Sequence, residues 1–225
     1  MALSPYIVTK GVVLRETETR DADKILTLLT AERGKLSVIA RGVCRKGCKF
    51  AACAQPLAYS EWTLYKKGDW YYANEGATLE LFNGLRADLD AMALGFYLAE
   101  LTERSCPAGM EQDAVLELLY YAFLVMDRGI LPPKLISRIF ELKLLQLNGL
   151  FASDVCHICG EGEGTLYFDG RMGAFYCEKH RTEDSIFVLD AVRRAVRFVL
   201  ERESRAAFGF QLSAEALEQL TFILR

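Results

Sequence analysis

Apolar and polar residues alternate over the first part of the chain in a way that is typical of short β-strands. Five runs are rich in β-branched and aromatic residues, and turn signals such as Lys67-Gly68-Asp69 separate them. The runs cover residues 6–14, 24–30, 35–42, 57–66 and 70–81. Five short strands predict a small β-barrel such as an OB-fold. An SH3-like barrel would give nearly the same pattern, so the strand number does not decide between them.

Beyond residue 82 the spacing of the apolar residues becomes helical. Apolar side chains recur every three or four positions along two segments, which predicts two helices with one buried face each. The residues expected on the first buried face are Leu85, Leu89, Met92, Phe96 and Ala99. Those expected on the second are Val115, Leu118, Leu119, Ala122 and Met126.

Three further helices are expected. Pro132-Pro133 starts a helix over 134–147 that is apolar on nearly all sides, and we expect this helix to be central. A cysteine-bearing loop follows, and then a helix at about 189–203 and a last helix over 214–224 with Ser213 as its N-cap. The fold class is therefore α+β, with an OB-fold barrel in residues 1–82 and a helical domain in residues 83–225.

Composition narrows the class of protein. The 225 residues are 52% hydrophobic and 25% charged, which predicts a folded globular chain. The net charge is −3, so any surface that binds nucleic acid must be a local patch. Residues 1–13 show no signal-peptide pattern, and the longest apolar stretch, 118–126, is too short to span a bilayer. We expect a cytoplasmic protein with no membrane contact.

Four residues in the cysteine-bearing loop have the spacing of a metal site. They are Cys156, Cys159, Cys177 and His180, in the pattern C-x2-C-x17-C-x2-H. Each short step turns two side chains toward one point, and a hairpin over 165–176 would bring the two steps together. Four soft protein ligands predict one structural zinc ion with no open catalytic position, in a finger over residues 153–182.

Other interpretations of these residues remain open. The four side chains could be buried without a metal, or Cys156 and Cys159 could be a redox pair. A redox motif is expected in a βαβ setting, which the sequence does not show. His157 lies inside the first step and could compete as a ligand. The remaining cysteines, Cys44, Cys48, Cys53 and Cys106, have no pairing pattern and are expected to be reduced thiols.

Basic residues concentrate between the third and fifth predicted strands. From residue 41 to residue 67 there are six basic residues and one acidic residue, Glu61. The glycine and lysine content predicts that the loop 43–50 projects into solvent. Trp62, Tyr65, Trp70, Tyr71 and Tyr72 lie nearby in sequence. Cations that neutralise phosphates and rings that stack on bases are what single-stranded DNA binding requires. The candidate DNA-binding residues are Lys35, Arg41, Arg45, Lys46, Lys49, Lys66 and Lys67.

Structural explanations compete with this interpretation. Each aromatic residue could fill the barrel core, and the lysines could simply solvate a loop. A second charged face comprises Arg193, Arg194, Arg197, Arg202 and Arg205, and the acidic residues Glu201 and Glu203 are interleaved with them. A solvated helix face is the expected reading of that group, and DNA contact is the alternative.

Three stretches together resemble the RecO family. The first comprises residues 11–15 (GVVLR), 23–30 (DKILTLLT), 34–37 (GKLS) and 40–42 (ARG), similar to the start of the family's OB domain. The second is FELKLL at 140–145 with Gly149-Leu150, similar to the family's central helix. The third is the cysteine motif, where many members carry four cysteines. His180 stands in place of the fourth cysteine, and since histidine also binds zinc, the site is expected to persist.

The resemblance implies a DNA-repair function without catalysis. RecO proteins bind single- and double-stranded DNA, anneal complementary strands and work with RecR and often RecF. They help RecA to load onto single-stranded DNA covered by SSB, and they contact the acidic tail of SSB. The residues that would hold this tail are not fixed by a motif; Arg138 and Lys143 are candidates. A nucleoid-associated location in the cytoplasm follows from the same resemblance.

Two other classes of function compete with a DNA-binding mediator. The first is a zinc-stabilised protein-interaction adaptor with only incidental DNA contact. The second is an enzyme that processes nucleic acid, but the sequence has no Walker loop and no nucleophile with a histidine base, and its two histidines include His180. We therefore expect no enzymatic activity.

Overall fold

The computed structural model describes residues 6–19, 21–151 and 153–224. The chain forms two compact units, Met1–Ile130 and Leu131–Arg225. The sequence changes from strands to helices at residue 82. The first compact unit nevertheless includes the first three helices together with the barrel. The first five residues, which belong to the segment where no signal peptide is expected, lie outside the described residues. Within the described ranges, no helix is both long enough and apolar enough to cross a membrane.

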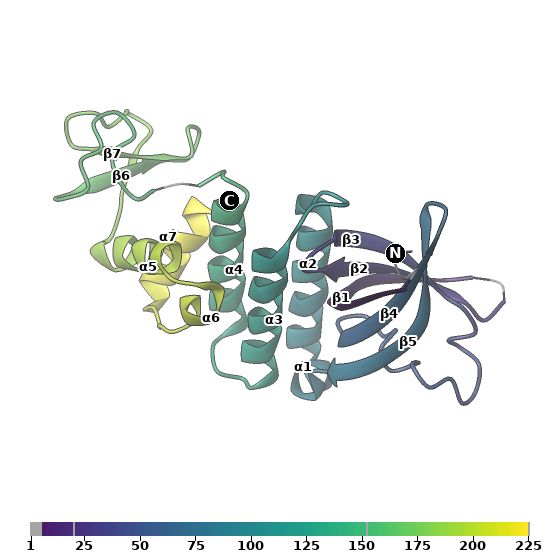
Figure 1. Cartoon of the computed structure of the whole chain (residues 1–225). Helices are drawn as coiled ribbons and strands as arrows, with labels where there is room; N and C mark the ends of the chain where they lie inside the picture. Colours follow the sequence, from purple (N-terminus) through teal and green to yellow (C-terminus); the bar gives the residue numbers. More distant parts are fainter. Residues whose placement is uncertain (1–5, 20, 152, 225) are drawn as a thin grey trace. The chain divides into compact units, whose positions relative to one another are not determined.

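The first unit contains a closed five-stranded barrel (Figure 1). Its strands are β1 (Tyr6–Glu18), β2 (Lys24–Thr30), β3 (Gly34–Ala40), β4 (Tyr59–Lys67) and β5 (Trp70–Glu80). The order around the barrel is β1-β2-β3-β5-β4, with β3 and β5 parallel and the other pairs antiparallel. The predicted barrel is thus confirmed, and its strand order is that expected of an OB-fold.

Side chains along the strands point alternately into and out of the barrel, and the inward ones fill its interior. Inward side chains such as Val13, Leu26, Leu28, Trp62 and Leu64 are completely buried. At about 1.5–3 kcal/mol for each large apolar side chain removed from water, these residues are the main source of stability for the barrel.

The segment 41–58 between β3 and β4 is a loop outside any helix, and most of 43–50 is exposed as predicted, but the segment does not stand free of the barrel. It is a series of turns whose apolar side chains join the barrel core, with Val43 and Cys53 buried and Phe50 packed 6.4 Å from Trp62 between ring centroids. The Cys53 thiol also lies 3.2 Å from the Thr78 hydroxyl. Apolar residues that alternate with the basic ones hold the segment against the barrel and leave the charged side chains outside.

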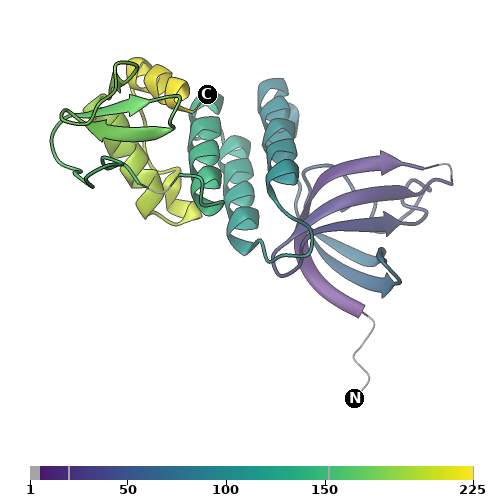
Figure 2. The same ribbon diagram turned by 90° about the horizontal axis from the view of Figure 1, so that it is seen from above.

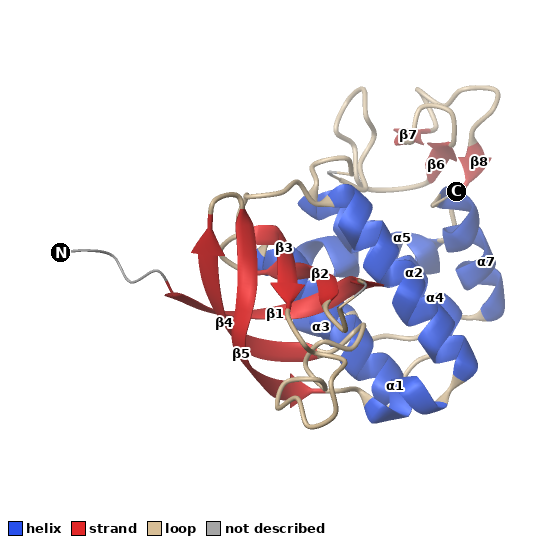
Figure 3. Ribbon diagram, turned by 90° about the vertical axis from the view of Figure 1, so that its right-hand side faces the viewer, coloured by secondary structure: helices blue, strands red, loops and turns tan. Residues whose placement is uncertain are grey.

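Three helices complete the first unit: α1 (Asn83–Ala87), α2 (Leu89–Ser105) and α3 (Asp113–Asp127), seen beside the barrel in Figures 1 and 3. All five residues predicted for the buried face of α3 are buried. The Asp127 carboxylate accepts the backbone N–H groups of Gly84 and Leu85 at 2.6 and 3.2 Å. This carboxylate ties the start of α1 to the end of α3.

The buried face predicted for the first helical segment is wrong in part. Leu89 is 77% exposed and Phe96 is 44% exposed, while α2 buries Ala91, Gly95, Leu98, Ala99 and Thr102. The reason is a break at Asp88, which has extended backbone angles and caps α2 by accepting the N–H of Ala91. The helical spacing that starts at Leu85 therefore does not continue into α2.

The second unit begins with α4 (Pro133–Leu147), which buries residues on most of its sides as predicted. The other helices are α5 (Asp190–Glu201), α6 (Ser204–Ala207) and α7 (Ala214–Ile223), and Ser213 caps α7 as expected. A small sheet of β6 (Leu166–Asp169), β7 (Ala174–Cys177) and β8 (Ile186–Phe187) has the order β7-β6-β8 (Figure 2).

Lys143 on α4 is buried, with 6% of its surface exposed. Its ammonium group donates to the backbone carbonyls of Val199 and Arg202 at 3.1 and 2.6 Å and to the Gln146 side chain at 2.7 Å. Burial lowers the pKa of Lys143. These carbonyls lie at the C-terminal end of α5, where backbone carbonyls lack partners within the helix. Lys143 on α4 therefore caps α5.

Candidate metal centre and nucleic-acid interface

The two short ligand steps fold as the sequence predicts. In the first, the Gly160 N–H donates to the Cys156 carbonyl and the Cys156 N–H donates to the Glu161 carbonyl, each at 2.8 Å. Gly160 has a φ of +72°, a conformation that glycine adopts without strain. In the second, β7 ends at Cys177, and the His180 N–H donates to the Cys177 carbonyl at 3.0 Å. The β6–β7 hairpin brings both steps together.

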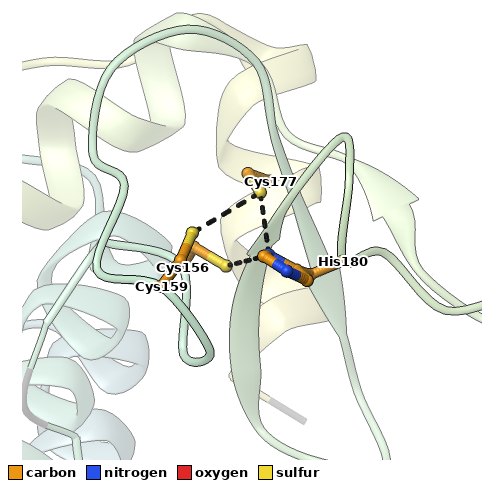
Figure 4. Close-up of side chains that lie close together, drawn as sticks. All are labelled: Cys156, Cys159, Cys177 and His180. Atoms are coloured by element: carbon orange, nitrogen blue, oxygen red, sulfur yellow. Dashed lines mark hydrogen bonds between the residues drawn. The ribbon is translucent and has the colours of Figure 1, made fainter.

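The four ligand atoms lie within 4.8 Å of one another and could hold a metal ion (Figure 4). The Cys159 and Cys177 sulfurs are 3.8 Å apart, and the His180 Nδ1 lies 3.6 Å from the Cys156 sulfur and 3.3 Å from the Cys177 sulfur. Tetrahedral zinc with metal–ligand distances of about 2.0–2.3 Å has ligand–ligand edges of about 3.6–3.8 Å. The donor set and its spacing therefore fit such an ion.

Neighbouring backbone N–H groups favour the metal-binding form of the Cys156 thiol. Burial raises its pKa, but the backbone N–H groups of Cys159, Cys177 and Ile158 outweigh this effect and lower the pKa to about 6. A thiolate is the form that binds a metal, so the fold favours the binding state of this ligand. His157 does not belong to the ligand cluster; its ring centroid lies 6.3 Å from that of Tyr176.

Asp169 holds the hairpin turn next to the second ligand step. One carboxylate oxygen accepts the backbone N–H groups of Arg171 and Met172 at 2.9 and 3.1 Å, and the other accepts the Thr182 hydroxyl at 2.5 Å. The Thr182 hydroxyl and the Met172 and Arg171 N–H groups lower the pKa of Asp169. The sequence pattern identified the turn but not this link to the segment that follows His180.

Two arginines on α5 attach the finger to the helix. Arg193 donates to the backbone carbonyls of Gly162, at 2.6 Å, and Gly164. Arg197 pairs with the Asp154 carboxylate at 2.9 Å. The Arg193 side chain is 13% exposed, so it belongs neither to a solvated face nor to an open DNA surface. Both interpretations offered from the sequence are therefore wrong for Arg193.

Six of the seven candidate DNA-binding residues are exposed on or beside the barrel strands. They are Arg41, Arg45, Lys46, Lys49, Lys66 and Lys67, and we call them the basic patch. The parallel pairing of Val38 with Tyr71 and of Ile39 with Tyr72 brings the end of β3 beside the start of β5. None of the six forms an ion pair with any described residue, so their charges are not neutralised within the described structure.

Lys35 lies apart from the basic patch. It is at the start of β3, whereas Arg41 follows the end of this strand, about 20 Å away at roughly 3.3 Å per residue. Its ammonium group donates to the backbone carbonyl of Glu103 at 2.6 Å. It lines a groove of about 620 Å³ between the barrel and α2, together with Leu14 and Phe96. The structure thus places Lys35 with the helices of the first unit.

The aromatic residues divide between the barrel interior and its surface. Trp62 is completely buried, and Tyr71 packs against the core. Trp70 is 44% exposed, and Tyr65 and Tyr72 are half-buried. The Lys66 ammonium lies 5.6 Å from the centroid of the Tyr71 ring, within the range of a cation–π contact. On the surface, the guanidinium carbon of Arg41 lies 4.9 Å from the centroid of the Tyr72 ring, so one core-packed ring and one outer ring lie beside basic side chains.

Comparison with known proteins covers both parts of the chain. Residues 1–82 match the family model "Recombination protein O N terminal", and residues 86–225 match "Recombination protein O C terminal". The two models together span nearly all of the sequence.

Individual relatives agree with the family models. The chain is 31% identical over 196 residues to the DNA repair protein RecO of Caldicellulosiruptor bescii, covering 86% of this chain and 80% of that protein. It is 27% identical over 220 residues to the DNA repair protein RecO of Acetivibrio thermocellus, covering 96% and 87%. It is 32% identical over 176 residues to the DNA repair protein RecO of Exiguobacterium sibiricum, covering 78% and 70%. The chain therefore belongs to the RecO family of DNA repair proteins, which are recombination mediators and not enzymes.

Proposed function

We propose that the chain binds single- and double-stranded DNA through the basic patch and anneals complementary strands. It also helps RecA to load onto single-stranded DNA covered by SSB, together with RecR and often RecF. The observation that carries DNA binding is the set of six exposed cations without ion-pair partners on a chain whose net charge is −3. Exposed cations without ion-pair partners on the barrel of an acidic protein favour phosphate binding there over the rest of the surface.

The segment 41–58 is suited to this role. Its apolar side chains pack on the barrel core, so Arg45, Lys46 and Lys49 are presented from a supported backbone. Less conformational entropy is then lost when DNA binds than with a free loop.

A salt titration of DNA binding by the full chain tests this proposal. The triple variant Arg45→Ala, Lys46→Ala, Lys49→Ala is expected to weaken binding and to reduce the slope of log K against log salt by up to about 0.9 for each lost phosphate contact. The matched control removes three exposed cations elsewhere in the first unit: Lys10, Arg33 and Arg128. Equal effects in both variants would show that the DNA surface is not the basic patch. A protein-interaction adaptor with incidental DNA contact would bind weakly at every salt concentration.

We also propose that Cys156, Cys159, Cys177 and His180 bind one zinc ion. The support is a closed set of four soft ligands at tetrahedral spacing. All four positions come from the protein, so the ion would order the finger without catalysing a reaction. Binding energy in such sites contributes directly to folding and reaches about 10 kcal/mol or more.

Elemental analysis of protein purified without chelator tests the metal. We expect one equivalent of zinc in the wild type and in the control Cys44→Ser, whose thiol is exposed and lies in the other unit. Cys156→Ser is expected to lose the metal. A content below about half an equivalent in the wild type, or a Cys156–Cys159 disulfide in fresh protein, would refute a structural zinc site.

The protein partners are proposed from the family: RecR, the acidic C-terminal tail of SSB, and often RecF and RecA. A cytoplasmic, nucleoid-associated location is proposed on the same ground. Lys143 was one of the two candidates for the SSB contact. The structure argues against it, because its ammonium already donates to backbone carbonyls. Titration of the chain with an acidic peptide of SSB-tail composition tests the contact, and no binding at low salt would refute it.

A further inference from the structure

Three tyrosines and an arginine form a continuous row across the barrel. The ring centroids of Tyr6 and Tyr65 are 6.1 Å apart, and those of Tyr65 and Tyr72 are 5.7 Å apart. The guanidinium carbon of Arg41 lies 4.9 Å from the centroid of the Tyr72 ring. We call these four residues the tyrosine row. It crosses β1, β4 and β5 and ends just after β3.

Strand register places the tyrosine row on the outside of the barrel. Tyr6 pairs with Tyr65, and Tyr65 pairs with Tyr72, so the three side chains project from one face of the sheet. Leu64 is completely buried in the core, so the next residue, Tyr65, faces outward. Tyr6 is 49% exposed. A role in the barrel core therefore does not account for these rings.

We propose that the tyrosine row is a subsite for unpaired bases and that it makes the barrel prefer single-stranded over duplex DNA. The inference rests on the DNA binding proposed above and assigns the choice of strand form to specific residues. Aromatic rings stack on bases of any sequence, whereas a duplex keeps its base faces inside its own stack.

The spacing of the rings favours a single strand. Bases in a B-form duplex follow one another at about 3.4 Å along each strand. The rings of the tyrosine row are 6.1 and 5.7 Å apart, with interplanar angles of 41° and 39°. Only a strand whose bases are unstacked and splayed apart can place successive bases on successive rings.

Charge on either side of the row indicates where the phosphates would lie. Lys67 pairs with Trp70 on one side of the row, and Arg41 lies at its end. On the other side, Thr63 pairs with Glu75, which is exposed. Phosphates are attracted to Lys67 and Arg41 and repelled by Glu75, so the backbone of a bound strand is expected along the Lys67 side.

The test compares a fluorescent oligothymidylate with a duplex of the same length, both binding to the full chain. The double variant Tyr65→Leu, Tyr72→Leu is expected to lose single-strand affinity by about tenfold or more, while duplex affinity changes by less than about twofold. The salt slope should stay unchanged because no phosphate contact is removed. Tyr65→Phe, Tyr72→Phe keeps both rings and should bind as the wild type does. Val8→Ala, on the same outer face but outside the row, is the matched control.

The outcomes separate this inference from the proposed function. Unchanged single-strand affinity in the leucine variant, or equal losses for single strand and duplex, overturns the proposal that the tyrosine row binds unpaired bases. Loss of DNA binding in the basic-patch variant would then still support the proposed function. A wild type that binds no DNA at any salt concentration refutes the proposed function itself.

A second measurement covers the case in which the leucine variant does not fold. An oligonucleotide carrying 5-bromouracil is cross-linked to the wild-type chain by light, and the adducts are mapped by mass spectrometry. Adducts on Tyr65 or Tyr72 support the inference, and adducts found only elsewhere overturn it.

Discussion

Replacing Lys143 with methionine should destabilise the second unit, because this lysine caps α5. Methionine fills the space of the aliphatic stem but cannot donate hydrogen bonds. The carbonyls of Val199 and Arg202 would then lose the donor that now lies 3.1 and 2.6 Å away. The Leu200 carbonyl keeps the Gln146 amide as a donor at 2.8 Å. Of the three backbone carbonyls that accept from Lys143, two are therefore left without a replacement donor, and the Gln146 side-chain oxygen also loses this hydrogen bond.

The size of the effect follows from this count. An unsatisfied buried polar group costs about 1–3 kcal/mol, so two carbonyls cost about 2–6 kcal/mol. Burial lowers the pKa of Lys143, which shows that dehydrating the ammonium opposes the stabilisation, and methionine removes that cost. We therefore expect a net loss of about 2–4 kcal/mol in the free energy of unfolding.

The assay is urea unfolding of the full chain, with hydrogen exchange at peptides that cover residues 190–203 to locate the change. The matched control is Lys134→Met on the same helix, which removes an exposed ion pair with Glu218 and should cost less than about 1 kcal/mol. If Lys143→Met costs no more than this control, or if exchange at the end of α5 does not increase, Lys143 is not a helix cap.

Three other changes test contacts described above. Asp169→Asn should lower Tm near neutral pH: the folded pKa lies below the unfolded value of about 3.9, so the stabilisation is complete above that value and is lost as pH falls through the folded pKa. Thermal scans at decreasing pH should show the two proteins converge, and a constant gap would contradict this. Gly84→Ala should cost about 2 kcal/mol or more, because a Cβ there would lie 2.2 Å from the Asp127 carbonyl oxygen, whereas Gly170→Ala meets nothing within 4 Å and should leave Tm nearly unchanged. Arg193→Met should speed hydrogen exchange at residues 160–165 while the metal content stays the same, and unchanged exchange would show that Arg193 does not hold the finger.

Much of the fold follows from local pattern. The second predicted strand, 24–30, has the observed bounds of β2, because alternation and turn residues both act over a few positions. The buried face of α2 does not follow, because spacing alone cannot show that Asp88 interrupts the helix. Gly95 also packs inward, where a Cβ would lie 2.9 Å from a Leu57 methyl group. The spacing of apolar residues in one segment does not show where another segment packs closely against it.

The metal cluster was predictable for a similar reason. Its four ligands form two short local steps, so spacing alone identifies them. The contacts that support the finger join distant positions: Arg193 reaches the Gly162 carbonyl 31 residues earlier, and Thr182 reaches Asp169 13 residues earlier. No periodic pattern links such residues, and only the folded chain shows them.

The aromatic residues of the barrel show that the side of the strand on which a ring lies determines whether it can bind DNA. Trp62, Tyr65, Tyr71 and Tyr72 are close in sequence and all aromatic, and composition cannot separate a core ring from a stacking ring. Strand alternation separates them, because Trp62 and Tyr71 lie on the core side while Tyr65 and Tyr72 lie outside. Substituting Trp62 would weaken DNA binding by unfolding the barrel, whichever surface DNA uses. A test of base stacking must therefore change Tyr65 and Tyr72 and leave the inward rings intact.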